Sequence, residues 1–234
     1  MSNLIKLLPD NIANQIAAGE VIQRPASVVK EIVENAIDAG ATKIDVNIKD
    51  AGKTLIQIVD NGQGMGPEDA EICFQRHATS KVNKAEDLFA LITKGFRGEA
   101  LASVAAIAHV ELKTRERGKD IGTSVTMEGS SIKESTETTC PEGTSFEIKN
   151  LFYNVPARRN FLKSDKAEFG HITDEFERVA LSHPEIHFTL HHNDNELYNF
   201  QDTILKKRII DVLGKKSSDR LVPIEESTEI VEMK

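Results

Sequence analysis

The sequence predicts an α/β protein in which helices accompany an antiparallel or mixed β-sheet. One segment, residues 28–39, has the period of an amphipathic helix: apolar residues fall on one side, and Glu31, Asn35 and Asp38 fall on the other. Several other segments alternate between apolar and polar residues, as half-buried strands do. Most of them follow residue 109 and are separated by glycines and charged turns, which favours antiparallel or mixed pairing.

The composition is that of a globular protein large enough to build a core. Of 234 residues, 39% are hydrophobic and 28% are charged, which excludes a disordered or fibrous chain. The formal net charge of -8 argues against nucleic-acid binding over the whole surface, so any DNA contact must be regional. Cys73 and Cys140 form no C-x-x-C pair, so we expect neither a disulfide framework nor a cysteine zinc site, and a reducing cytoplasm fits. Pro9 and Asp10 interrupt the first apolar residues, so we expect no signal peptide and no membrane span.

The first half of the chain reads as two helices, a hairpin and further short helices. Asp10 is expected to cap a short helix that Gly19 ends, and Pro25 suits the first turn of the amphipathic helix. Two segments rich in β-branched residues predict a hairpin. Its strands are residues 43–50 and 54–60, and the turn is 51–53. Helices are then expected at 67–74 and 85–92, and a loop at 93–101 leads into an alanine-rich helix that ends near residue 108.

The second half is predicted to be mostly strands. The expected strands are residues 109–116, 121–128, 130–137 and 145–153, followed by a long helix at 164–182, a hairpin at 186–200 and a helix at 203–213. From residue 221 onward, new strands begin without partners. We therefore expect the chain to stop inside a second domain.

The polar side of the 28–39 helix is the first candidate site. Glu31 and Asn35 are one helical turn apart, so a carboxylate and an amide oxygen lie side by side, and the stripe itself contains no Lys or Arg. A solvated helix face is the ordinary meaning of such a pattern. The pair also suits a hard cation with a water molecule, which is the alternative that chemistry favours.

Glycine-bearing loops form the second group of candidates. Asp60 ends a predicted strand, and the glycines that follow at alternate positions allow either a close approach to a flat or charged group or simply a flexible turn. Residues 75–81 combine hydroxyl groups with Lys81 in a polar loop. The loop at 93–101 enters a helix, and such junctions present free N–H groups to an anion such as phosphate, although the segment is not a P-loop.

A basic cluster lies further along the chain. Arg158, Arg159 and Lys163 occur within six residues, next to aromatic side chains. A local basic surface is the usual meaning, and DNA contact is the alternative, which needs an array of such charges.

Four segments in a fixed order, EIVENAIDAG, DNGQGMG, GFRGEALASV and EGTSFEI, resemble the GHKL ATPase superfamily. That superfamily includes the gyrase-type ATPases, the large heat-shock chaperone and the histidine kinases. The blocks NQIAAGEVIQRPASVVKEIVENAIDAGA, RHATSK, GFRGEALAS and LFYNVPARRNFLK are similar to the MutL family of DNA mismatch repair proteins in particular. The resemblance implies a two-layer α/β sandwich of the GHKL (Bergerat) type, with helices on one face of a mixed, mostly antiparallel sheet. It also implies an ATP-binding domain at residues 1–205, and a linker with the truncated start of a transducer-like domain at 206–234.

The same resemblance implies roles for individual residues. Glu31 would be the general base that activates water, and Asn35 would ligate Mg²⁺. Asp60 would accept a hydrogen bond from the adenine amino group, and Thr144 would share a water at that base edge. Residues 79–81 and 95–101 would close over the phosphates as a lid. The further ATP contacts implied are Asp38, Gly62, Gly64, Met65, Thr79, Ser80, Lys81, Gly95, Phe96, Arg97, Gly98, Glu99, Ala100 and Leu101.

The function implied is a Mg²⁺-dependent, weakly hydrolysing ATPase domain in which ATP orders the lid and drives homodimerisation. The relay would run from the mismatch-recognition protein MutS to a downstream nuclease and a helicase, with mismatched DNA at Arg158, Arg159 and Lys163. The family pattern includes a phosphate-contacting lysine from the second domain that has no position up to Lys234, so we expect weak hydrolysis. A cytoplasmic, nucleoid-associated bacterial protein is implied, with no membrane contact.

Three other functions remain as alternatives. One is a nucleotide-responsive scaffold that binds DNA or proteins and whose turnover is incidental. Phosphotransfer as in the histidine kinases is disfavoured because the histidines lie outside any helical dimerisation segment before the ATP site. A gyrase-type topoisomerase is disfavoured by the MutL-type blocks.

Overall fold

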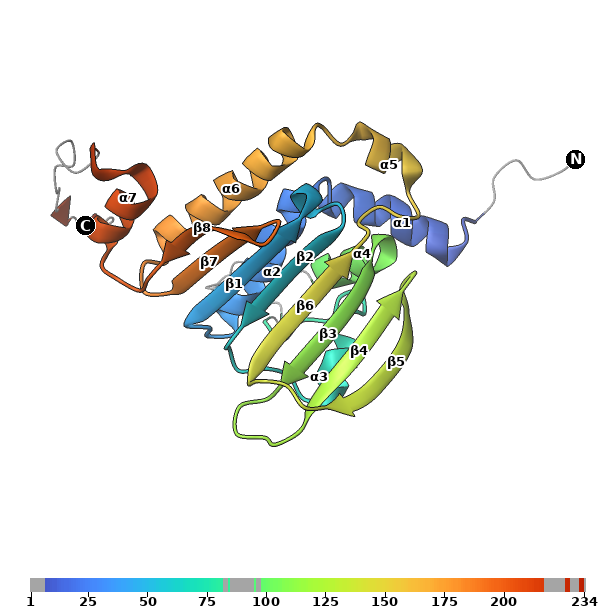
Figure 1. Cartoon of the computed structure of the whole chain (residues 1–234). Coiled ribbons are helices and arrows are strands. Elements are labelled where there is room, and N and C mark those ends of the chain that lie inside the picture. The colour runs from blue at the N-terminus through green and yellow to red at the C-terminus, as the bar shows by residue number, and fades with distance from the viewer. Residues whose placement is uncertain are drawn as a thin grey trace, which may run out of the picture.

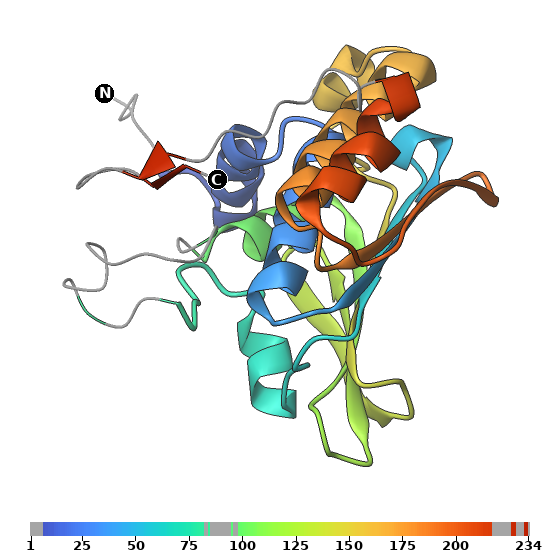
Figure 2. The same ribbon diagram turned by 90° about the vertical axis from the view of Figure 1, so that its left-hand side faces the viewer.

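The computed structural model describes residues 7–81, 84, 95, 98–216, 226–227 and 232–233. Its main feature is an eight-stranded sheet with helices on one face, which Figure 2 shows nearly edge-on. The strands are β1 Lys43–Lys49, β2 Leu55–Asp60, β3 His109–Arg115, β4 Gly122–Glu128, β5 Ser131–Thr138, β6 Gly143–Lys149, β7 His187–His192 and β8 Asn195–Phe200.

The strand order is β5-β4-β3-β6-β2-β1-β7-β8 (Figure 1). Neighbouring strands pair antiparallel throughout, except that β1 and β7 are parallel. The predicted mixed, mostly antiparallel sheet with helices on one face is therefore confirmed. This order places the end of β2 beside the start of β6 in the middle of the sheet.

The helices are α1 Asp10–Val21, α2 Pro25–Asp38, α3 Pro67–Ile72, α4 Ala100–Ile107, α5 Pro156–Phe161, α6 Asp165–Ser182 and α7 Leu205–Leu213, with a 3-10 turn η1 at Asp50–Gly52. Helix α1 packs against α4, and α2 packs against α6 (Figure 1). The short helix α5 was not expected from the sequence, and the helix predicted at 85–92 lies outside the described residues.

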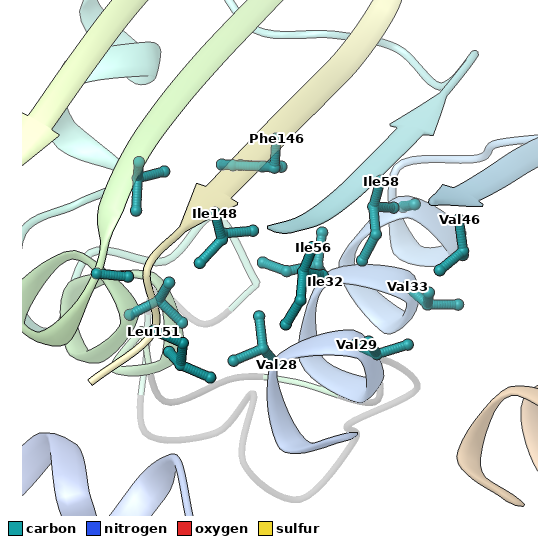
Figure 3. Packing of buried hydrophobic residues seen from close by; sticks show 14 of the residues in the cluster. Val28, Val29, Ile32, Val33, Val46, Ile56, Ile58, Phe146, Ile148 and Leu151 are labelled. Atoms are coloured by element: carbon teal, nitrogen blue, oxygen red, sulfur yellow. The ribbon is translucent and has the colours of Figure 1, made fainter. Parts of the chain in front are cut away.

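Helix α2 is held in place by its apolar side, as its period predicts. Val29, Ile32 and Val33 are almost completely buried and join one cluster with Ile56 and Ile58 of β2 (Figure 3). Burial of each such side chain contributes roughly 1.5–3 kcal/mol, so packing outweighs the lack of a side-chain cap at the start of the helix. The packing fixes which way the polar side of α2 faces.

The predicted end of the first helix at Gly19 is wrong. Helix α1 begins at Asp10, with Pro9 rather than Asp10 at the capping position, and continues to Val21. A Cβ atom at Gly19 would lie 2.5 Å from Nη2 of Arg158. The missing side chain leaves room for the guanidinium of an arginine of α5, and Gly19 does not end the helix.

Two further differences concern the ends of strands. The segment predicted as one strand at 145–153 ends as β6 at Lys149, because the chain then turns, with Asn150 and Phe152 at positive φ. The late segments expected to lack partners pair with each other, as β9 Glu226–Ser227 and β10 Glu232–Met233. Two segments so close in sequence can pair without a second domain.

Helix α7 begins where the second domain was predicted to start. Its Arg208 is fully buried and donates hydrogen bonds to backbone carbonyls around the start of β7 and the end of β8. The boundary after residue 205 stays a prediction.

Candidate functional site

The polar side of α2 meets two segments that are far away in sequence. The Lys81 Nζ atom lies 2.9 Å from Oδ1 of Asn35 and 2.6 Å from Oδ2 of Asp38. A Cβ atom at Gly95 would lie 3.4 Å from Nζ of Lys81 and 3.8 Å from Oδ1 of Asn35. The structure thus brings together the helix, the end of the 75–81 loop and one residue of the 93–101 loop.

Glu31 has a cationic neighbour on its own helix. Lys30 Nζ lies 3.4 Å from Oε1 of Glu31 and 2.9 Å from Oε2 of Glu34. The polar side of α2 therefore does have cationic partners, in contrast to the expectation from its own residues. The lysine one position earlier is long enough to reach the stripe, and Lys81 reaches it from another segment.

These oxygens form a cradle that holds a positive charge. An amide oxygen of Asn35 and a carboxylate oxygen of Asp38 converge on the single ammonium group of Lys81. Oxygen ligands of this kind suit Mg²⁺, which binds through one or two protein groups plus water and phosphate oxygens. No cluster of three or more His, Cys, Asp or Glu side chains suited to a metal occurs among the described residues. The donor set thus fits a metal shared with a ligand better than a metal held by protein alone.

Asp60 lies at the end of β2, directly opposite Thr144 of β6. Asp60 is only 7% exposed, and its Oδ1 accepts a hydrogen bond from the N–H of Gly62 at 2.8 Å. Burial raises the pKa of Asp60 from 3.8 to about 6, although backbone hydrogen bonds from Gly62 and Thr144 oppose the shift. Burial thus makes the charged form of Asp60 costly, and the two backbone N–H groups offset part of that cost.

The pKa of Asp60 predicts how the stability of the ligand-free protein depends on pH. Below about pH 4 the carboxyl is protonated in both the folded and the unfolded chain. Between about pH 4 and 6 the unfolded chain releases this proton while the folded chain keeps it, so stability falls over this range and stays at the lower level above it. Asparagine carries no charge, so Asp60→Asn should remove this loss of stability. We expect the substitution to raise the free energy of unfolding at pH 7 by up to about 3 kcal/mol more than it does at pH 4. Urea unfolding from pH 4 to 8 measures it; parallel profiles for wild type and variant would contradict it.

Thr114 is a residue of this region that the sequence did not single out. Its side chain is fully buried at the end of β3, and its hydroxyl contacts Met65, Gly143 and Thr144. A threonine in an alternating strand carries no signal of such a role. Only the pairing of β3 with β6 brings it there.

The glycines after Asp60 are explained first by the protein itself. A Cβ atom at Gly64, which has φ +68°, would collide with the backbone carbonyl of Arg115. At Gly62 it would lie 2.9 Å from Oδ1 of Asp60. The loop therefore is not simply a flexible turn: it packs tightly against the end of β3 and against its own carboxylate.

The loop entering α4 is described from Gly98 onward. Gly98 has φ +61°, and its carbonyl accepts a hydrogen bond from the N–H of His77 at 2.9 Å. Glu99 is the capping residue of α4, and no side-chain hydrogen bond caps the start of this helix. Phe96 and Arg97 lie outside the described residues. In the neighbouring loop, Oγ1 of Thr79 accepts from the N–H of Lys81, and Ser80 is exposed.

The predicted basic cluster forms a separate surface, at α5. Arg158 and Lys163 line a pocket of about 320 Å³ whose other lining residues are Gln23, Arg24, Ala157, Phe161, Leu162 and Glu168. Arg159 belongs to the same helix, and Phe161 is 86% exposed. The cluster thus combines cations with an exposed aromatic ring, away from Asp60.

Residues 23–156 match the family model described as histidine kinase-, DNA gyrase B- and HSP90-like ATPase. That match covers more than half of the chain and includes both the polar side of α2 and the Asp60–Thr144 pair. The chain therefore belongs to this ATPase family. No described helix is long and apolar enough to cross a membrane.

The relatives narrow the assignment. DNA mismatch repair protein MutL of Christiangramia forsetii is 60% identical over 100% of the chain, and that of Flavobacterium johnsoniae is 59% identical over 99%. The solved structure of the Aquifex aeolicus MutL ATPase domain complexed with ADP superposes with a TM-score of 0.68 and 32% identity, over 82% of the chain and 70% of its own length. Within the ATPase family, the chain belongs to the MutL branch. It spans 38% and 36% of the two mismatch repair proteins.

Proposed function

We propose that the chain is the Mg²⁺-dependent, weakly hydrolysing ATPase domain of a MutL-type mismatch repair protein. The observation that carries this proposal is the arrangement of two acidic positions on adjoining elements. Asp60 is a buried carboxylate that backbone N–H groups anchor at the end of β2. Glu31, Asn35 and Asp38 line the polar side of α2, which packs on that strand. One position suits the base of a nucleotide and the other suits its phosphates.

The base end would select adenine. A carboxylate accepts a hydrogen bond from an exocyclic amine, and a base without that amine leaves the buried charge unpaired. Thr144 lies opposite Asp60 in the strand pairing and can share a water at the same base edge. Gly62, Gly64 and Met65 follow Asp60 directly and complete this end.

The phosphate end would hold ATP through charge and backbone N–H groups. Lys81 already contacts Asn35 and Asp38. An ATP phosphate with its metal would therefore enter a cluster that offers an ammonium group to the phosphate and oxygen atoms to the metal. Asn35 would ligate Mg²⁺, which offsets the charge of the phosphate oxygens when bound. Thr79, Ser80, Gly95, Phe96, Arg97, Gly98 and the start of α4 from Glu99 to Leu101 would close over the phosphates.

Hydrolysis requires a base at the attacking water. Glu31 would take a proton from that water. At the same time the water oxygen would bond to the terminal phosphorus, and the bond from this phosphorus to ADP would break. Lys30, which contacts both Glu31 and Glu34, is placed to hold the Glu31 side chain near its position.

We further propose that residues 1–205 form the nucleotide-binding domain and that 206–234 begin a second one. ATP binding would order the lid and favour a homodimer, and the state of the dimer would relay mismatch detection by MutS to a nuclease and a helicase in the cytoplasm.

DNA would contact Arg158, Arg159 and Lys163, where cations surround an exposed aromatic ring. That basic surface also favours the alternative of a nucleotide-responsive DNA- or protein-binding scaffold with negligible turnover in this part of the protein.

Equilibrium binding of Mg²⁺-ATP and Mg²⁺-GTP at pH 7.5 tests the proposal. We expect selective ATP binding by wild type, and at least tenfold weaker ATP binding by Asp60→Asn, because the amide cannot supply a charged acceptor to the adenine amine. Glu31→Ala should bind ATP as wild type does. Equal binding of ATP and GTP by wild type would overturn the adenine role, and no binding at all would favour the scaffold.

A further inference from the structure

The hydroxyl group of Thr114 is surrounded by three hydrogen-bonding partners beneath the Asp60 end of the site. It accepts from the N–H of Met65 at 2.9 Å and donates to the carbonyl of Gly143 at 3.0 Å. Its Oγ1 also lies 3.2 Å from Oγ1 of Thr144. The three partners come from the loop after β2 and from the start of β6, so Thr114 joins the two segments that carry the base end of the site.

These partners decide which threonine donates to the other. A hydroxyl has one proton and two lone pairs. Thr114 gives its proton to Gly143 and uses one lone pair for Met65, so the only group left to face Thr144 is its second lone pair. The hydrogen bond between the two hydroxyls therefore runs from Thr144 to Thr114. With its proton used inward, Thr144 has only lone pairs left for the site.

Asp60, which lies beside Thr144, also presents only hydrogen-bond acceptors. A charged carboxylate has only lone pairs, and two backbone N–H groups hold it in place. Thr144 and Asp60 are directly opposite in the β2–β6 pairing. Together they form an edge that accepts hydrogen bonds and cannot donate one.

We propose that Thr114 is a specificity-determining positioning residue, which fixes the Thr144 hydroxyl as an acceptor and so excludes purines that carry an oxygen at C6. This inference rests on the proposed nucleotide function. An adenine amine, or a water that donates toward the protein, satisfies the accepting edge. A 6-oxo group meets lone pairs on both sides and stays unsatisfied. Without Thr114, the Thr144 proton is free to turn outward and donate to that oxygen.

Binding of Mg²⁺-ATP and Mg²⁺-ITP to Thr114→Val measures the effect, because inosine carries an oxygen where adenosine carries the amine. Valine keeps the shape of threonine and removes the hydroxyl. We expect the ratio of ATP to ITP affinity to fall about tenfold, the value of one hydrogen bond. Thr114→Ser, which restores the hydroxyl, should keep the wild-type ratio.

Two further variants separate this role from a loss of stability. Thr189→Val also removes a buried hydroxyl. This hydroxyl, on β7, donates to Oδ1 of Asp45 on β1 at 2.7 Å, away from the Asp60 end of the site. It should lower the urea midpoint and leave the ATP to ITP ratio unchanged. In a Thr144→Val background, Thr114→Val should change the ratio no further, because its effect passes through Thr144.

The outcomes are distinct. If wild type binds ATP selectively and Thr114→Val keeps the full ratio, or if the effects of the two valine substitutions add, the inference on Thr114 is wrong and the proposed function stands. If wild type binds neither nucleotide, the proposed function fails and the inference fails with it. Should Thr114→Val not fold, Thr144→Val alone tests the accepting hydroxyl, since an unchanged ratio in that variant also overturns the inference.

Discussion

Replacing Glu31 with glutamine should lower the rate of ATP hydrolysis by about two to four orders of magnitude, the contribution of a positioned general base. Glutamine has nearly the same shape, keeps an oxygen for Lys30, and cannot take a proton from water. ATP affinity should change by less than about threefold, because the base acts in the transition state more than in binding. Single-turnover hydrolysis of labelled Mg²⁺-ATP, together with equilibrium binding, measures both quantities on the same protein.

Glu34→Gln is the matched control for this prediction. Glu34 is on the same helix, is also a carboxylate, and shares Lys30 with Glu31, at 2.9 Å against 3.4 Å. Its removal should therefore disturb Lys30 as much as the loss of Glu31 does, while leaving hydrolysis within a few-fold of wild type. Comparable losses of rate in the two variants would mean that the charge balance around Lys30, rather than a base at Glu31, controls turnover.

The fold could be predicted in large part because its elements are strongly patterned. The apolar side of α2 and the alternation of the strands each follow from burial on one face, and that burial is local information. Helix α6 likewise buries Ile172 and Phe176, as its period predicts. The feature that the sequence does not reveal at Gly19 is tertiary: the guanidinium of Arg158, from another helix, lies against this glycine inside α1.

The candidate site could be predicted only where a motif carried it. Asp60 and Thr144 were found by resemblance, and the strand pairing then placed them opposite each other. Thr114 was missed because its partners are between 29 and 49 residues away in sequence and meet it only in the sheet. The contact of Lys81 with Asp38 was missed for the same reason, since it joins positions 43 residues apart. Long-range hydrogen bonds leave no periodic trace in a sequence.

Arg208 shows the same limit most clearly, because three consecutive cations look alike in the sequence. Lys206 and Lys207 of α7 are exposed, whereas Arg208 is fully buried. Its guanidinium donates to carbonyl oxygens that end α6, lead into β7 and follow β8. The acceptors are those of Ala180 at 2.6 Å, His183 at 3.3 Å, Pro184 at 3.1 Å, Ile186 at 2.8 Å, Phe200 at 3.5 Å and Gln201 at 2.9 Å.

Arg208→Met should therefore lower the free energy of unfolding by about 3–5 kcal/mol, since several buried carbonyls lose their donors at once. Arg208→Lys should restore little, because one ammonium cannot span acceptors that a planar guanidinium reaches from both ends. Lys207→Met, on the exposed side of the same helix, should change stability by less than about 0.5 kcal/mol. Urea unfolding of the three variants measures these differences. A loss of the same small size for Arg208→Met and Lys207→Met would mean that α7 is not anchored to the sheet through this side chain. A large loss for Arg208→Met alone would make α7 part of the folding unit of the sheet, and the domain boundary that we propose after residue 205 would then have to move beyond α7.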